Sequence, residues 1–356
     1  MKLFNCFIFI INIFFFLYKK NEYSTFFKNS DLYIFSSASI YKKHFQIKNN
    51  SFNSLKQKKV SIYCVDTLNN SVYIHYYKNM IKNQNLIIEI NKDHPDFLIY
   101  DVFGCEHLNE KYNDSVKIAF YSENIIPDFS ESDYSLSQPH IIYLDRYFKY
   151  PSFIYRLKKF SGYKVKDIKT FAKNKKKTKF CAAVISNPTQ TLRVEFIKKL
   201  NKYKHVDMGG SYLNNVGGKV KDKIEFLSSY KFSIAMENSN GDGYISEKIV
   251  ESLIAGTIPI YYGSYLIDEY INPRVFILIK GEKDIESKIE YIKKIDRDEE
   301  LYNSILQEKI FINEKYNDII EKTESEKKLF LDNIFLQSKN EAKRIDDVNS
   351  IYNCKK

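Results

Sequence analysis

The chain has 356 residues, of which 44% are hydrophobic and 16% are aromatic, and this composition excludes a disordered chain. The length favours two domains over a single hydrophobic core. The formal net charge of +11 is compatible with a nucleic acid, an anionic membrane surface or a phosphorylated small molecule as partner. The five cysteines are odd in number and form no CxxC pair, so they indicate neither a zinc site nor a disulfide framework.

The N-terminus begins with an apolar stretch, LFNCFIFIINIFFFLY (3–18), which is followed by two lysines. This stretch is short for a membrane-spanning helix, which needs about 20 residues. No small-residue cleavage site follows, and we therefore predict an uncleaved membrane anchor over residues 1–20, with a buried helix as the alternative. Basic residues on both flanks leave its orientation open. Residues 21–57 are polar, rich in Lys, Asn and Ser, and predict a stem.

Residues 58–172 alternate between strand-like and helix-like segments, which predicts a Rossmann-like α/β domain. The helix candidate is YIHYYKNMIKN (73–83). The strand candidates are short and rich in β-branched and aromatic residues: KKVSIYCVD (58–66), LIIEI (86–90), DFLIYDVF (96–103) and VKIAFY (116–121).

A basic run, KNKKKTK (173–179), separates this domain from a second one. No nucleic-acid-binding motif accompanies the run, which favours a solvated linker over a nucleic-acid patch, and we expect no nucleic acid as partner. Residues 180–315 repeat the alternation and predict a second Rossmann-like domain. Residues 316–356 predict a helical tail, in which FLDNIFL (330–336) favours a packing helix over a membrane-surface helix.

A polar segment, MENSNGDGYISEKI (236–249), interrupts the second domain between a predicted strand and a predicted helix. Ligands bind at this carboxyl edge in open parallel sheets. Ser246 is a plausible N-cap, and Lys248 in the first helical turn opposes the helix dipole unless an anion binds there. Gly241 and Gly243 predict a loop that approaches a ligand closely. These residues alone are equally compatible with a loop that binds nothing.

The longer stretch FSIAMENSNGDGYISEKIVESLIAGTIPIYYGS (232–264) resembles the donor-binding signature of glycosyltransferase family 10, the α-1,3/4-fucosyltransferases. The upstream stretch 184–233 resembles the bacterial branch of that family, including its SNP…Arg193 and GGS…Asn elements. The segments YSENIIPDF (121–129) and DRYFKYP (145–151) match more weakly. The residues of the main stretch that fall on the family pattern are Glu237, Asn238, Ser239, Tyr244, Ser246, Glu247, Lys248, Thr257, Pro259 and Gly263.

The resemblance implies a GT-B fold, in which two Rossmann-like domains face each other across a cleft. It also implies inverting transfer of L-fucose from GDP-fucose to a hydroxyl of N-acetylglucosamine or glucose in a glycan, with α-1,3 as the expected linkage. The glycan would belong to protein glycosylation or to lipopolysaccharide or glycolipid synthesis. The N-terminal anchor would place a eukaryotic protein in the Golgi membrane, and a bacterial one on the cytoplasmic face of the inner membrane.

The same resemblance assigns roles to individual residues. Glu123 matches the general base that takes the acceptor proton. Arg193 and Lys248 match the cations on the diphosphate. The remaining candidates contact the donor: Tyr244 and Glu247 at the ribose or fucose, and Asn238 at the sugar or the loop. Glu237 has two alternative roles, stabilising the oxocarbenium ion or ordering the loop.

We expect no metal and no other cofactor, because Arg193 and Lys248 would replace the ion. The chain contains one DxD sequence, Asp296 to Asp298, which we predict to be solvated surface. Two other functions stay open: a GT-B transferase with a different nucleotide-sugar donor, and a catalytically silent protein that binds glycans or nucleotides.

Overall fold

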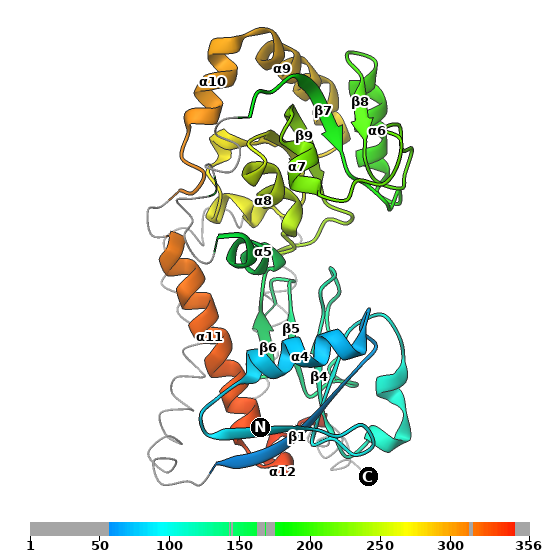
Figure 1. Ribbon diagram of the computed structural model, residues 1–356, viewed down its shortest axis with the longest axis vertical. Coiled ribbons are helices and arrows are strands. Elements are labelled where there is room, and N and C mark those ends of the chain that lie inside the picture. Colours follow the sequence, from blue (N-terminus) through cyan, green and yellow to red (C-terminus); the bar gives the residue numbers. More distant parts are fainter. Residues whose placement is uncertain are drawn as a thin grey trace, which may run out of the picture. The chain divides into compact units, whose positions relative to one another are not determined.

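The computed structural model describes residues 57–141, 143, 145–161, 168, 175–312 and 316–345 (Figure 1). The predicted anchor and nearly all of the predicted stem lie outside these residues. No helix in the described part of the chain is both long and apolar enough to cross a membrane. Residues from Ser54 to the C-terminus form one compact unit.

The first sheet has six parallel strands in the order β2-β1-β3-β4-β5-β6. Its strands are β1 (Lys58–Val65), β2 (Leu86–Ile90), β3 (Phe97–Tyr100), β4 (Val116–Phe120), β5 (Tyr134–Ser137) and β6 (Tyr147–Lys149). All residues of β3 are buried because this strand lies inside the sheet. Two helices accompany the sheet: α4 (Asn70–Ile81), which Asn69 caps by accepting from the Val72 N–H, and α5 (Ser152–Ser161).

The second sheet has five parallel strands in the order β11-β10-β9-β7-β8. Its strands are β7 (Lys179–Ala183), β8 (Val206–Met208), β9 (Tyr230–Met236), β10 (Ile258–Tyr262) and β11 (Ile277–Leu278). The helices of this half are α6 (Thr191–Asn201), α7 (Lys223–Leu227), α8 (Glu247–Ile254), α9 (Ile285–Arg297) and α10 (Glu299–Gln307). Apolar residues of the strands and of α6 and α9 form one core cluster. The two parallel sheets confirm the predicted pair of Rossmann-like α/β units.

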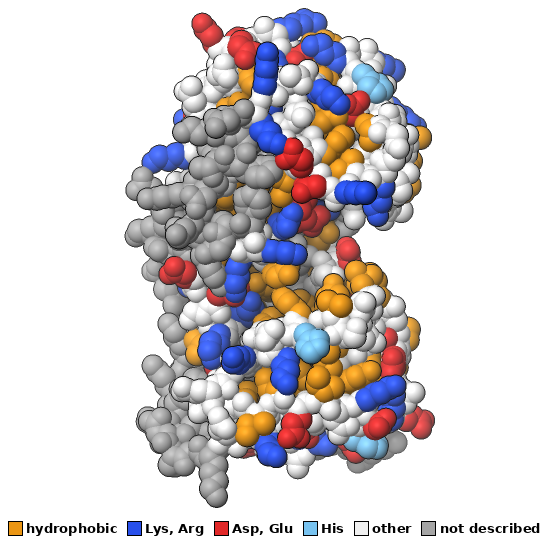
Figure 2. Space-filling view, in the orientation of Figure 1, with side chains coloured by type: hydrophobic (Ala, Val, Ile, Leu, Met, Phe, Trp, Pro, Cys, Tyr) orange, Lys and Arg blue, Asp and Glu red, His pale blue; other side chains and the backbone are white. Residues whose placement is uncertain are grey.

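The described end of the basic run is not a purely solvated linker. Lys179 already belongs to β7, and the ammonium of Lys177 donates to the carbonyl oxygens of Ser228 at 2.7 Å and Ala255 at 2.6 Å. These two residues are the C-caps of α7 and α8, where unpaired carbonyls attract a cation. Burial, followed by the charge of Lys175, lowers the pKa of Lys177 to about 8. On the face drawn in Figure 2, Lys and Arg side chains are interspersed with acidic and uncharged ones.

The C-terminal helix α11 (Tyr316–Leu336) returns to the first sheet, and α12 (Lys339–Ala342) follows it (Figure 1). The Phe335 ring lies 4.6 Å from the Phe97 ring of β3, and Phe330 stacks on Phe148 of β6 at 5.5 Å between ring centroids. Residues of FLDNIFL are therefore core residues of the first sheet, which confirms the predicted packing helix.

Candidate active site

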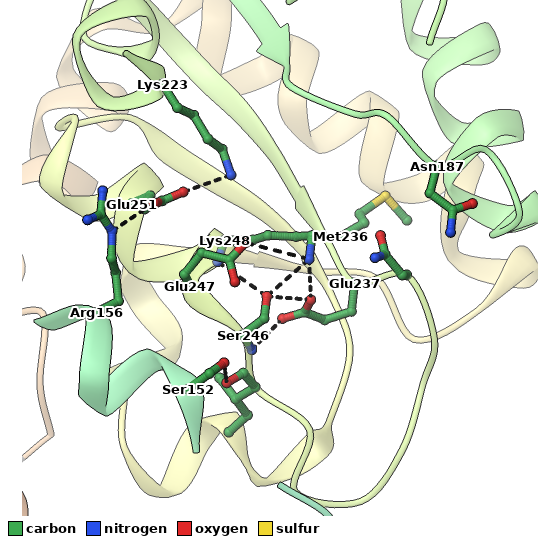
Figure 3. Close-up of polar contacts among 12 residues, drawn as sticks. Ser152, Arg156, Asn187, Lys223, Met236, Glu237, Ser246, Glu247, Lys248 and Glu251 are labelled. Atoms are coloured by element: carbon green, nitrogen blue, oxygen red, sulfur yellow. Dashed lines mark hydrogen bonds and ion pairs between the residues drawn. The ribbon is translucent and has the colours of Figure 1, made fainter. Parts of the chain in front are cut away.

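The loop between β9 and α8 is fixed by a buried carboxylate at its first residue, Glu237. Its Oε1 accepts the Ser246 N–H at 2.8 Å, while Oε2 accepts the Ser246 hydroxyl at 2.6 Å and the Lys248 ammonium at 3.0 Å (Figure 3). Burial raises the pKa of Glu237, but all three neighbours donate, and this arrangement fits the ionised form. The carboxylate thus ties the start of the loop to the first turn of α8.

Lys248 and Glu247 are the first two helical residues after the predicted N-cap, Ser246, whose hydroxyl accepts the Lys248 N–H at 3.3 Å. Burial lowers the pKa of Lys248, but Glu237 and Glu247 outweigh burial and raise it. Burial likewise raises the pKa of Glu247, but Lys248 and Lys223 outweigh it and lower the value. The Lys248 side chain is 16% exposed and that of Glu247 is 42% exposed, so both charged groups reach solvent at the helix start.

Arg193 is completely buried, although the helical pattern alone would place it on the exposed face of its helix. Its Nη1 donates to the Met236 carbonyl oxygen at 3.0 Å and to Asn238 Oδ1 at 2.8 Å, and its Nη2 donates to the Asn187 carbonyl oxygen. Its Nε has no hydrogen-bond partner among the described residues. Burial lowers the pKa of Arg193, and Glu237 opposes this effect.

Arg193 and Lys248 lie on either side of Glu237, because Arg193 donates to Met236 and Asn238 and Lys248 donates to the Glu237 carboxylate. Two cations therefore converge at the end of β9, together with the N-terminus of α8. An anion bound here would relieve their mutual repulsion and would lie at the positive end of the helix dipole. The arrangement is suited to a diphosphate.

Tyr244 and Glu123 lie on neighbouring loops of the two sheets. Glu123 lies in the loop after β4 and is half-buried, whereas Tyr244 is buried in the loop before α8. Burial raises the pKa of Tyr244, and the carboxylates of Glu237 and Glu123 raise it further. The expected contact of Tyr244 with ribose or fucose stays a prediction.

Gly241 and Gly243 approach the first sheet's loops rather than leaving open space for a ligand. A Cβ on Gly241 would lie 2.5 Å from Asn124 Nδ2, and one on Gly243 would lie 2.8 Å from the His140 backbone nitrogen. Gly243 also has a φ of +89°, which other residues rarely adopt. Between them, Asp242 accepts the His140 N–H through its carbonyl oxygen at 2.7 Å. The two glycines are therefore needed for close contact between loops.

The residues Asn124 and Ser239 belong to two separate motifs that matched the family pattern, and the structure joins them. Asn124 Nδ2 donates to Ser239 Oγ at 2.9 Å.

Sequence reasoning missed a third polar residue at this edge, Asp101, which directly follows β3. Burial raises the pKa of Asp101 to about 6, even though hydrogen bonds from Val102 and Ser122 lower it, and the charge of Glu123 adds to the increase. The sequence feature that could have identified Asp101 is an acidic residue at the carboxyl end of a buried strand.

The predicted solvated DxD sequence is only partly solvated. The side chain of Asp296 is 3% exposed and pairs with Lys204, while its Oδ2 also accepts the Tyr203 hydroxyl at 2.9 Å. Asp298 caps α10 by accepting the Leu301 N–H at 2.9 Å. The two carboxylates thus have separate structural partners. In the described ranges, no group of three or more His, Cys, Asp or Glu side chains is arranged to hold a metal ion.

Two family models match the chain. The model of glycosyltransferase family 10 (fucosyltransferase), C-terminal part, matches residues 174–350, and that of the alpha-(1,3)-fucosyltransferase FucT N-terminal domain matches residues 61–156. Alpha-(1,3)-fucosyltransferase FucT of Helicobacter pylori is 31% identical over 243 residues, which cover 60% of this chain and 51% of the relative. The chain therefore spans about half the length of that protein.

Solved structures agree with these matches. The crystal structure of an alpha1,3-fucosyltransferase superposes with a TM-score of 0.64 and 25% identity, covering 78% of this chain and 93% of the other. A crystal structure of alpha1,3-fucosyltransferase with GDP-fucose gives a TM-score of 0.62 at 24% identity, covering 79% and 93%. These likenesses confirm a GT-B-like α/β fold, and with the two family models they establish that the chain belongs to glycosyltransferase family 10, the fucosyltransferases.

Proposed function

We propose that the chain is an inverting fucosyltransferase that transfers L-fucose from GDP-fucose to a hydroxyl of N-acetylglucosamine or glucose in a glycan, with an α-1,3 linkage. The observation that carries this proposal is the hydrogen bond that Asn124, the residue after Glu123, donates to Ser239 at 2.9 Å. This bond joins the loop of the first sheet that carries Glu123 to the loop of the second sheet that leads to Lys248. The GDP-fucose complex of a protein with this fold supports the choice of donor.

The donor half of the proposed site is electrostatic. The diphosphate lies at the start of α8, where Lys248 shares its ammonium protons between Glu237 and a phosphate oxygen. Arg193 contributes the second positive charge from its buried position beside Asn238. When the bond between the anomeric carbon and the phosphate oxygen breaks, the electron pair leaves with GDP. The two cations and the helix N-terminus stabilise that growing negative charge.

The acceptor half of the proposed site supplies the base. The acceptor hydroxyl attacks the anomeric carbon from the side opposite GDP, and its proton passes to the Glu123 carboxylate. The hydrogen bond from Asn124 to Ser239 holds the Glu123 loop against residues 237–246, the donor loop. Asn238 supports the site through its contact with Arg193, and Glu247 extends toward the sugar or ribose. Both oxygens of Glu237 are engaged in the loop, which favours the loop-ordering role over an oxocarbenium contact.

The direct test incubates the purified protein with GDP-fucose and N-acetyllactosamine, with parallel reactions that contain GDP-mannose or UDP-galactose. Fucosylated product, released GDP in equal amount and an α-1,3 linkage by NMR are the expected results. Transfer from another donor would instead support a different GT-B transferase. GDP binding without any transfer would support a catalytically silent binding protein.

The membrane anchor over residues 1–20 stays a prediction, and so do the Golgi or inner-membrane locations that follow from it. These residues lie outside the described part of the chain. Fractionation of cells that express the full chain, compared with a chain lacking residues 1–57, tests the anchor. Recovery of both proteins in the soluble fraction would contradict it.

A further inference from the structure

The residue directly before the candidate base is held by a buried glutamine. Gln138 follows β5 and is 1% exposed. Its Nε2 donates to the carbonyl oxygen of Ser122 at 2.5 Å. From the other side, the Ser122 hydroxyl lies 3.1 Å from Asp101 Oδ2. Ser122 is therefore held by hydrogen bonds on both sides. These bonds restrict the backbone of the next residue, Glu123.

The other end of the same amide contacts the first turn of α5. Gln138 Oε1 accepts the Ser152 N–H at 3.2 Å and lies 3.1 Å from the Ser152 hydroxyl. The next N–H of that turn, from Phe153, donates to the Ile245 carbonyl oxygen at 3.4 Å. Ile245 lies between Tyr244 and the N-cap of α8. Figure 3 shows Ser152 beside the Ser246 end of this loop. The first turn of α5 thus connects Gln138 to the loop that leads into α8.

We propose that Gln138 is a positioning residue, which sets the position of Glu123 relative to the donor loop; this role rests on the proposed function. The position requires a donor toward Ser122 and an acceptor toward Ser152, and a glutamine amide supplies both. The backbone of Gln138 also lies against the donor loop, since a Cβ on Gly243 would be 2.9 Å from the Gln138 carbonyl oxygen. Gln138 therefore acts on the base without contacting the substrate.

The Gln138→Glu variant separates the two contacts. A carboxylate still accepts from Ser152, but it cannot donate to the Ser122 carbonyl oxygen. We expect kcat for fucosyl transfer to fall by about 10- to 100-fold, because a small displacement of a catalytic group has effects of this size. The affinity for GDP, measured by calorimetry, should stay unchanged, because the contacts that hold the donor loop remain.

A matched control is available in Gln337, which is also buried and donates through Nε2 to a backbone carbonyl oxygen, that of Asn333, at 2.5 Å. Gln337→Glu should lower stability without lowering kcat. Gln138→Met buries no charge and removes both contacts, so it serves as the second variant if Gln138→Glu does not fold. It should show the same selective loss of kcat.

A double-mutant cycle with Glu123→Gln distinguishes positioning from a general structural role. If Gln138 acts through Glu123, the double variant is no slower than Glu123→Gln alone. Additive losses, a parallel loss of GDP affinity, or normal kcat in the Gln138 variants would overturn the positioning role. Absence of fucosyl transfer in the wild-type protein would instead overturn the proposed function, and this role with it.

Discussion

Replacing Glu237 by Gln keeps the shape of a buried side chain and removes its charge. Both oxygens of the native carboxylate face donors only: the Ser246 N–H, the Ser246 hydroxyl and the Lys248 ammonium. A glutamine amide nitrogen is itself a donor, so it meets another donor in either orientation. We expect a contact with Ser246 or Lys248 to be lost, and the charge that stabilised the Lys248 ammonium to be lost with it.

The expected loss of stability follows from these contacts. Hydrogen bonds to charged groups contribute about 1.5–3 kcal/mol each. Removing one partner of a buried ion pair costs about 3–5 kcal/mol. We therefore expect the free energy of unfolding to fall by about 3–5 kcal/mol, a large part of the roughly 5–15 kcal/mol that a typical protein has. Urea denaturation of the variant and the wild type measures this difference.

GDP should partly reverse the effect, because its diphosphate can replace the missing counter-ion of Lys248. Saturating GDP should raise the Tm of Glu237→Gln by at least as much as that of the wild type. Glu299→Gln is the control, since Glu299 is 71% exposed in its ion pair with Lys231. Unchanged unfolding free energy together with a collapse of kcat would refute the loop-ordering role and favour the oxocarbenium role.

Three further predictions concern charge. Arg193→Ala and Lys248→Ala should each weaken GDP binding by about 10- to 100-fold, from about 1.5–3 kcal/mol per charge-assisted contact; calorimetry measures this, with the exposed Arg274→Ala as control. Fucosyl transfer should continue in EDTA, because two cations and a helix N-terminus already face the leaving group, and an absolute requirement for Mn²⁺ would contradict this. The pKa of Asp101 is raised to about 6 in the folded protein, so its contribution to stability is present below its ordinary pKa near 3.8 and is lost as the pH rises through 6. Asp101→Asn should flatten the stability profile between those values, and a profile identical to the wild type would exclude the effect.

Much of the architecture could be predicted because its strands are short apolar runs between turn residues. The strand β5, with the sequence YSLS, gave no such signal, since two of its four residues are serines. All four residues are nevertheless buried, because β5 lies between β4 and β6 in the sheet. Burial of a serine in a strand depends on its neighbours in space, which periodicity along the chain does not report.

The candidate site could be predicted in its composition but not in its internal contacts. The helical pattern put Arg193 on an exposed face, whereas the end of β9 and Asn238 enclose it. The glycines of the loop indicated a close approach, but only the fold identified Asn124 and His140 as the groups approached. The Asn124–Ser239 contact joins segments more than 100 residues apart in the chain. Patterns of neighbouring residues cannot predict such a contact.

The most direct test of the central claim is the turnover of Glu123→Gln with GDP-fucose and N-acetyllactosamine. Glutamine keeps the size of Glu123, but it cannot take the acceptor proton. We expect kcat to fall by about 10²- to 10⁴-fold, while the affinity for GDP-fucose is preserved. Near-normal kcat in this variant would contradict the assignment of Glu123 as the general base.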